Sequence, residues 1–198
     1  MGSIGGKRRI RAALVCAGLA AAAATVVPAA ASAATALPDA GGTSLGQHGK
    51  PGYTLPEGTP KPTGDYRVQS VYKVVKGVQT YTCDATGAWG AASTPEAQLA
   101  RYGRPGKIHH YAGPRWTARD GSTVVAAVDT RVPQTGTIPW LLLKVTAHEN
   151  DGPRKELHPV EWISRVNTTG GVSPTGTCTP GETSSVPYGA DYVFWAPA

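Results

Sequence analysis

The stretch TVVAAVDTR, residues 123–131, decides the fold class of this 198-residue chain. It is rich in β-branched residues and ends in a regular alternation of apolar and polar side chains, which is typical of a β-strand. Asp120-Gly121, directly before it, is a turn signal, and Trp116-Thr117-Ala118 lies on the other side of that turn. The segment therefore predicts a β-hairpin.

Similar strand patterns occur on both sides of the hairpin. They cover residues 66–75, 78–83, 138–147, 160–166 and 191–195, with Gly and Pro between them at the short spacing of sandwiches and barrels. There are no internal repeats and no alternation of strands with long helices, so dinucleotide-binding folds are not expected.

One segment favours a helix. Ser93-Thr94-Pro95-Glu96 has the form of a capping box, the apolar residues Ala97, Leu99 and Ala100 follow it, and Gly103 would end the helix. We therefore predict an all-β protein, an antiparallel β-sandwich or flattened barrel, with one short helix near residues 94–102.

The N-terminus has the three parts of a secretory signal peptide. Lys7 to Arg11 is basic, a run of small apolar residues follows to about Val27, and an A-x-A element ends the region. We favour cleavage after Ala33, with Ala36 as the alternative. The apolar run is short and alanine-rich for a bilayer span, so we expect a signal peptide over residues 1–33, a secreted, extracellular protein and no stable membrane span.

Most of the net positive charge of the chain lies in the predicted signal peptide. The chain has a formal net charge of +6, but four of its 19 basic residues lie in the predicted signal. The remainder carries 15 basic and 13 acidic residues, a net charge of +2, with no basic cluster. Phosphate backbones are bound by clustered cations, so nucleic acid is not an expected partner.

The rest of the chain divides into a leader and a domain. Residues 34–64 are rich in Pro and Gly and poor in large apolar residues, so we expect a flexible leader, docked in part near Tyr53 and Leu55. Residues 65–198 are long enough for a single β domain with its own core. Cys83 and Cys178 lie in this domain and are expected to form a disulfide bond, because two cysteines in an exported chain usually pair.

Several strings stand out along the chain: residues 76–83, 93–97, 108–114, 116 with 120–122, 138–144, 165–171 and 186–192. Together they resemble a secreted bacterial and fungal family catalogued as domain of unknown function 3455. The resemblance runs from about Val68 to Trp195 and implies no established activity. Some fungal members carry the label malate dehydrogenase, but this chain has no glycine-rich turn between a strand and a helix that would hold a dinucleotide.

Four residues are candidates for a polar site: His109, His110, Asp120 and Arg165. Adjacent residues of a strand point to opposite faces, so one of the two histidines would face a given site. Asp120 is also explained by its turn. Arg165 suits a carboxylate or sugar ligand, or a buried ion pair that closes one end of the core. One of these histidines with His148 or His158, plus Asp120, Asp129, Glu149 or Glu161, could make a set of metal ligands.

We interpret the protein as an extracellular binding or structural module. Its ligand is unknown, with a glycan or cell-wall component as one class, and no cofactor is expected. The five tryptophans either pack in the core or form a stacking platform for carbohydrate. The alternative is an extracellular enzyme centred on His109 or His110, with or without a metal ion.

Overall fold

The computed structural model describes residues 52–198, and every regular element in this range is a β-strand. The predicted signal peptide and the first part of the predicted leader lie outside the described residues. The strands are β1 (Tyr66–Cys83), β2 (Trp89–Arg101), β3 (Lys107–Tyr111), β4 (Arg115–Ala118), β5 (Thr123–Val132), β6 (Trp140–Glu149), β7 (Trp162–Gly170) and β8 (Thr183–Pro197).

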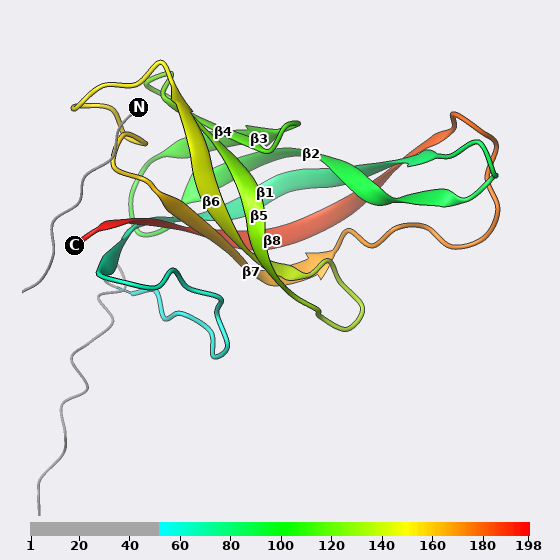
Figure 1. Ribbon diagram of the computed structural model, residues 1–198, viewed down its shortest axis with the longest axis horizontal. Coiled ribbons are helices and arrows are strands. Elements are labelled where there is room, and N and C mark those ends of the chain that lie inside the picture. The colour runs from blue at the N-terminus through cyan, green and yellow to red at the C-terminus, as the bar shows by residue number, and fades with distance from the viewer. Residues whose placement is uncertain (1–51) are drawn as a thin grey trace, which may run out of the picture. The chain divides into compact units, whose positions relative to one another are not determined.

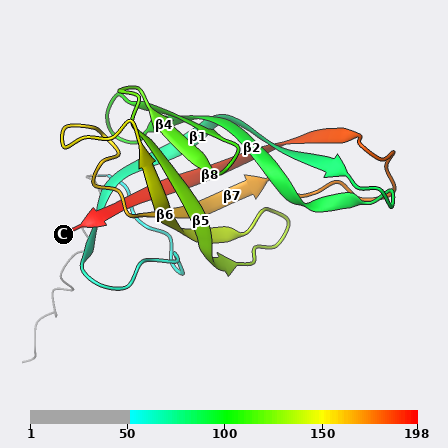
Figure 2. The ribbon, with the colours of Figure 1, turned by 45° about the horizontal axis from the view of Figure 1, so that its top comes forward.

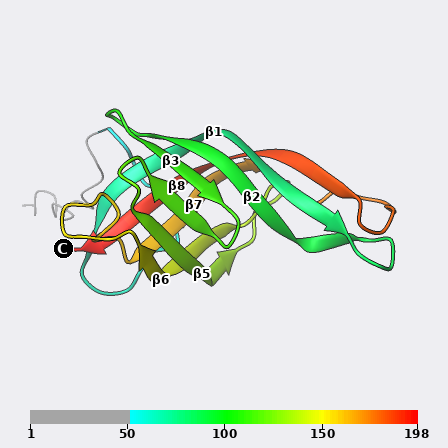
Figure 3. The ribbon, with the colours of Figure 1, turned by 90° about the horizontal axis from the view of Figure 1, so that it is seen from above.

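These strands form one closed antiparallel barrel (Figure 1). Each strand pairs with its neighbours in the chain, and β1 pairs with β8 to close the sheet. The prediction of an all-β fold is confirmed, and the barrel is the form that the fold takes. Figure 2 and Figure 3 show that β1, β2 and β8 run on together beyond the shorter strands.

The hairpin that decides the fold class is formed by β4 and β5, as the sequence predicts. Thr117 lies opposite Thr123, and the turn between the strands is closed by a 3.0 Å hydrogen bond from the Gly121 N–H to the Ala118 carbonyl. Gly121 has a φ of 82°, which other residue types adopt with difficulty. The Asp-Gly signal was therefore a reliable guide to this turn.

The predicted helix near residues 94–102 is wrong. These residues belong to β2, where Ala97 and Leu99 are buried while the alternate residues Glu96 and Gln98 are exposed. This period of two fits a strand, and β2 gains backbone hydrogen bonds from β1 on one side and β3 on the other. Pro95 is tolerated because the pairing with β3 begins at Ala97, so the strand has a free edge at the proline.

Alternate residues of the strands fill the barrel. The interior cluster holds large side chains such as Tyr72, Leu99, Trp116, Ile163 and Phe194, each less than 2 % exposed. A second apolar cluster lies on the outer face around Val193 and Trp195. Tyr53 and Leu55, from the irregular segment before β1, pack against that second cluster.

The predicted disulfide bond is confirmed. Cys83 at the end of β1 is joined to Cys178, 95 positions later in the irregular segment before β8. The bond therefore links the far end of the long strands to that segment. No helix within residues 52–198 has the length and hydropathy to cross a membrane.

Candidate functional site

A cavity of about 280 Å³ opens at one end of the barrel. Its walls reach from the fully buried Trp116 to the exposed Arg131, so the cavity connects the barrel interior with solvent. The volume equals the liquid volume of about nine water molecules. Eight-stranded barrels either fill their interior with side chains or hold one small ligand, and this cavity permits the second.

Three aromatic side chains form the inner wall of the cavity. His110 on β3 and Trp116 on β4 lie opposite each other in the ladder, and their rings stack with centroids 4.2 Å apart and planes inclined by 6°. Tyr192 on β8 presents its ring in edge geometry to both, at 5.1 Å from His110 and 5.7 Å from Trp116. The group combines a rigid apolar surface with ring nitrogens and a hydroxyl.

His110 is a neutral side chain in this wall. Burial, together with the positive charge of Arg165, lowers its pKa from 6.5 to about 3. Its Nδ1 lies 2.9 Å from the Arg115 carbonyl oxygen, and since a carbonyl can only accept, Nδ1 carries the proton. Nε2 is therefore the acceptor of the ring, and no side chain or backbone group of residues 52–198 donates to it.

Arg165 on β7 is the charged group of the cavity. It shares the interior face with Ile163 and lies between Leu141 and Tyr192 in the ladders. Its Nε and Nη2 both donate to the Pro139 carbonyl, at 3.2 and 2.8 Å. This anchor holds the half-buried guanidinium in place, and no carboxylate of the described residues pairs with it.

His109 points away from the cavity. Its side chain is 41 % exposed on the outer face, where Nε2 lies 2.6 Å from a carboxylate oxygen of Glu96 and the ring stacks on Tyr111. His109 and His110 therefore face opposite sides of the strand, as expected for adjacent residues. Residues 52–198 contain no group of three or more His, Cys, Asp or Glu residues placed to hold a metal ion.

Asp120 lies at the other end of the barrel, where it fixes a closing segment. One carboxylate oxygen accepts from the backbone and hydroxyl of Ser122, at 2.9 and 2.6 Å, and the other accepts from the Glu156 backbone N–H at 2.7 Å. Burial raises the pKa of Asp120, but these hydrogen bonds outweigh it and lower the pKa overall. The segment between β6 and β7 then inserts Leu157 and Val160, both fully buried, into the core.

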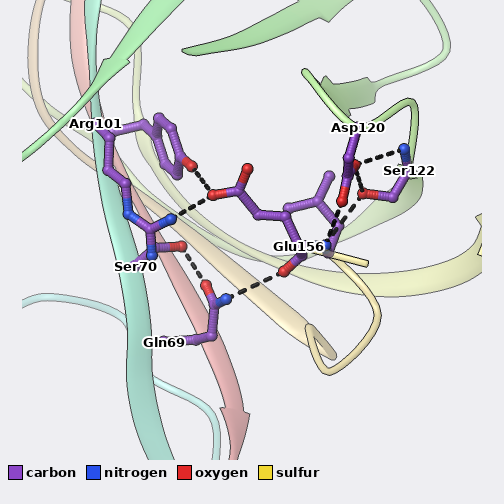
Figure 4. A network of polar contacts seen from close by, with 8 residues as sticks. Gln69, Ser70, Arg101, Asp120, Ser122 and Glu156 are labelled. Atoms are coloured by element: carbon purple, nitrogen blue, oxygen red, sulfur yellow. Dashed lines mark hydrogen bonds and ion pairs between the residues drawn. The ribbon is translucent and has the colours of Figure 1, made fainter. Parts of the chain in front are cut away.

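The same segment brings an ion pair into the closed end (Figure 4). The Glu156 carboxylate accepts from Arg101 Nη1 and from the Tyr72 hydroxyl. Gln69 Nε2 donates to the Glu156 carbonyl at 3.1 Å. A buried ion pair closing one end of the core was one of the two interpretations of Arg165. In the structure Arg101 has that role.

Of the four residues singled out in the sequence, the structure brings His110 and Arg165 together and separates His109 and Asp120 from them. Sequence reasoning missed the part played by Trp116 and Tyr192. Their apolar or β-prone character in a strand predicts core packing, and nothing local distinguishes a core residue from a cavity wall. The other tryptophans are partly or fully buried, and none is among the exposed large apolar residues.

Fold and site together define the class: a small, disulfide-linked antiparallel barrel, plugged at one end and hollow at the other. Residues 103–196 match the family described as "Protein of unknown function (DUF3455)". This match supports membership of the family that the sequence resemblance predicted, and it begins later than Val68. The matched range runs from before β3 into β8 and includes His110, Trp116 and Arg165. Searches of curated proteins and of solved structures found no match.

Proposed function

We propose that this protein is an extracellular binding module that takes a small organic molecule into the open end of its barrel. The observation that carries the proposal is the asymmetry of the two ends. Leu157 and Val160 plug one end, whereas the other keeps a cavity of about 280 Å³ with aromatic walls. Ligand pockets have this combination of an apolar lining with a few convergent polar groups.

The polar groups of the cavity suit binding better than hydrolysis. His110 is neutral, and its Nδ1 is held by a backbone carbonyl rather than by a carboxylate. The cavity walls, as far as the described residues form them, contain no Asp, Glu or Cys to act with the ring. The alternative of an enzyme centred on His109 or His110 therefore gains no support from this geometry.

The extracellular setting of the proposal has two supports. A disulfide bond persists in oxidising compartments, and Cys83–Cys178 is formed in the structure. The predicted signal peptide is the second. The sequence suggested a glycan or another cell-wall component as the ligand, and we keep that class in the proposal. The cavity can hold only a small group of such a ligand.

Binding is tested by NMR on isotope-labelled protein with two planar probes, neutral cinnamamide and anionic cinnamate. We expect at least one probe to shift the signals of Trp116 and Tyr192 in a saturable way. Ala112→Trp places a large ring at the exposed rim of the cavity and should abolish the effect. Ala127→Trp adds the same ring at an exposed position of β5 outside the cavity and should leave binding intact.

Two results would overturn the proposal. One is that neither probe shifts any cavity signal up to its solubility limit. The other is that Ala112→Trp binds as well as Ala127→Trp, which would place the probe elsewhere on the protein.

A further inference from the structure

We propose that the ligand of this cavity is an organic carboxylate, with its anionic group held by Arg165 and its apolar body against the aromatic wall. This inference rests on the proposed binding function and specifies the ligand. It starts from the charge of the cavity. Arg131 and Arg165 both contribute to the walls, and no Asp or Glu of the described residues does.

Neither arginine is neutralised by a neighbour. The ion pairs found within residues 52–198 use Arg101, Arg115 and two histidines. Arg165 is half-buried in a wall that also contains Ile138, Leu141 and Leu143. A bound anion would stabilise the charged guanidinium here, because an apolar wall screens the attraction between the two charges far less than water does.

Arg165 is held in an orientation that leaves donors for a ligand. A guanidinium has five N–H groups, and the Pro139 carbonyl accepts from Nε and Nη2. Tyr192, directly opposite in the ladder, is another polar neighbour of Arg165. The remaining N–H groups include the Nη1 pair. A planar guanidinium fixed in this way matches the two oxygens of a carboxylate, which a single point charge would not.

Two further donors belong to residues of the cavity wall and have no acceptors. Trp116 Nε1 and Gln79 Nε2 are both buried, both residues line the cavity, and neither nitrogen has a hydrogen-bond partner among the described residues. Buried donors are normally paired, so two unpaired donors in the wall of one cavity favour a ligand rich in acceptor oxygens. A carboxylate supplies such oxygens.

The remainder of the ligand is set by the other walls. The stacked rings of His110 and Trp116 and the edge of Tyr192 offer a flat, mostly apolar surface. The neutral His110 has one acceptor, Nε2, which suits a hydroxyl or N–H of the ligand. A volume of about 280 Å³ limits the ligand to a small molecule, such as one ring with a short acidic arm.

The test compares acids with their isosteric neutral amides on the full protein. The pairs are benzoate with benzamide, phenylacetate with phenylacetamide, and cinnamate with cinnamamide, titrated by NMR at neutral pH. We expect each acid that binds to bind at least about tenfold more tightly than its amide, the range expected for a hydrogen bond to a charged group. Arg165→Gln should remove this preference, while Arg165→Lys should keep part of it.

The control variant is Arg119→Gln, which removes an exposed arginine from the β4–β5 turn, outside the cavity walls. It should bind the acids as the unchanged protein does. Binding of acids and amides with equal affinity would overturn the carboxylate inference and leave the binding function standing. An acid preference that survives in Arg165→Gln would also overturn it. Failure of all six probes would overturn the binding function itself. The comparison on the unchanged protein does not depend on whether a variant folds.

Discussion

The stability of this barrel should depend on pH through His110. Burial keeps the folded ring neutral and lowers its pKa from 6.5 to about 3, with Arg165 and His109 as the nearby positive groups that act in the same direction. In the unfolded chain the ring binds a proton below about pH 6.5. Between these two values the unfolded state binds more protons, so the free energy of unfolding must fall as the pH falls.

The size of the effect follows from the width of that window. Each unit of pH within it is worth about 1.4 kcal/mol. Going from about pH 7.5 to about pH 4.5 crosses about two units of the window, so His110 alone should remove about 2.7 kcal/mol from the free energy of unfolding. This is a large part of the roughly 5–15 kcal/mol that stabilises a typical domain.

Urea unfolding at several pH values measures this loss. The reference is His110→Phe, which keeps a flat ring beside Trp116 but cannot be protonated. Other titrating groups act in both proteins, so the difference between their free energies of unfolding isolates His110 and should change by about 2.7 kcal/mol over that range. Parallel pH profiles would refute the reasoning, since the ring would then titrate alike in the folded and unfolded states. Nitrogen NMR should also find the proton on Nδ1.

Two further predictions concern parts of the fold away from the cavity. Replacing Cys83 and Cys178 together by Ala should lower the free energy of unfolding by about 4–5 kcal/mol, because the bond closes a loop of 95 positions. A loss below about 1 kcal/mol in urea unfolding would contradict this. Asp120→Ala should cost about 1–2 kcal/mol, a modest value because the side chain is exposed, by removing the acceptor shared by Ser122 and the Glu156 N–H. The pKa of Asp120 is lowered, so this contribution to stability is present above the ordinary carboxyl pKa and is lost as the pH falls below it. Equal stability of the variant and the unchanged protein at neutral pH would contradict the assignment.

The strands were predictable because they depend on local sequence patterns. The disulfide bond was predictable because two cysteines in an exported chain usually pair. Alternation and turn signals located the β4–β5 hairpin, and cysteine number predicted the pair Cys83–Cys178. Closure of the barrel was not predictable in this way. It requires β1 to pair with β8 across more than 100 residues, which no local pattern specifies.

The failed helix shows how tertiary pairing overrides a local signal. Ser93-Thr94-Pro95-Glu96 carries the residues of a capping box, but isolated helices of two or three turns are marginal. In β2 the same residues gain backbone partners from β1 and, from Ala97 onward, from β3. In the sequence, the apolar residues Ala97, Leu99 and Ala100 are compatible with either element over so short a segment.

Part of the candidate site was predictable from the sequence. His110 and Arg165 were identified by residue type, because histidine suits metal binding or acid–base chemistry and arginine suits the binding of a carboxylate. Their meeting depends on register: Arg165 lies opposite Tyr192, and His110 lies opposite Trp116. A shift of one residue in β3 would have turned His109 inward instead. Glu156 was missed because it lies in an irregular segment with no motif.

The most direct test of the central claim is a crystal structure of the protein grown with cinnamate. We predict ligand density inside the barrel, with the carboxylate within hydrogen-bond distance of the Arg165 guanidinium and the ring against Trp116 and Tyr192. Cinnamate density on the outer surface, or a cavity without it under conditions where NMR shows saturation, would contradict the account.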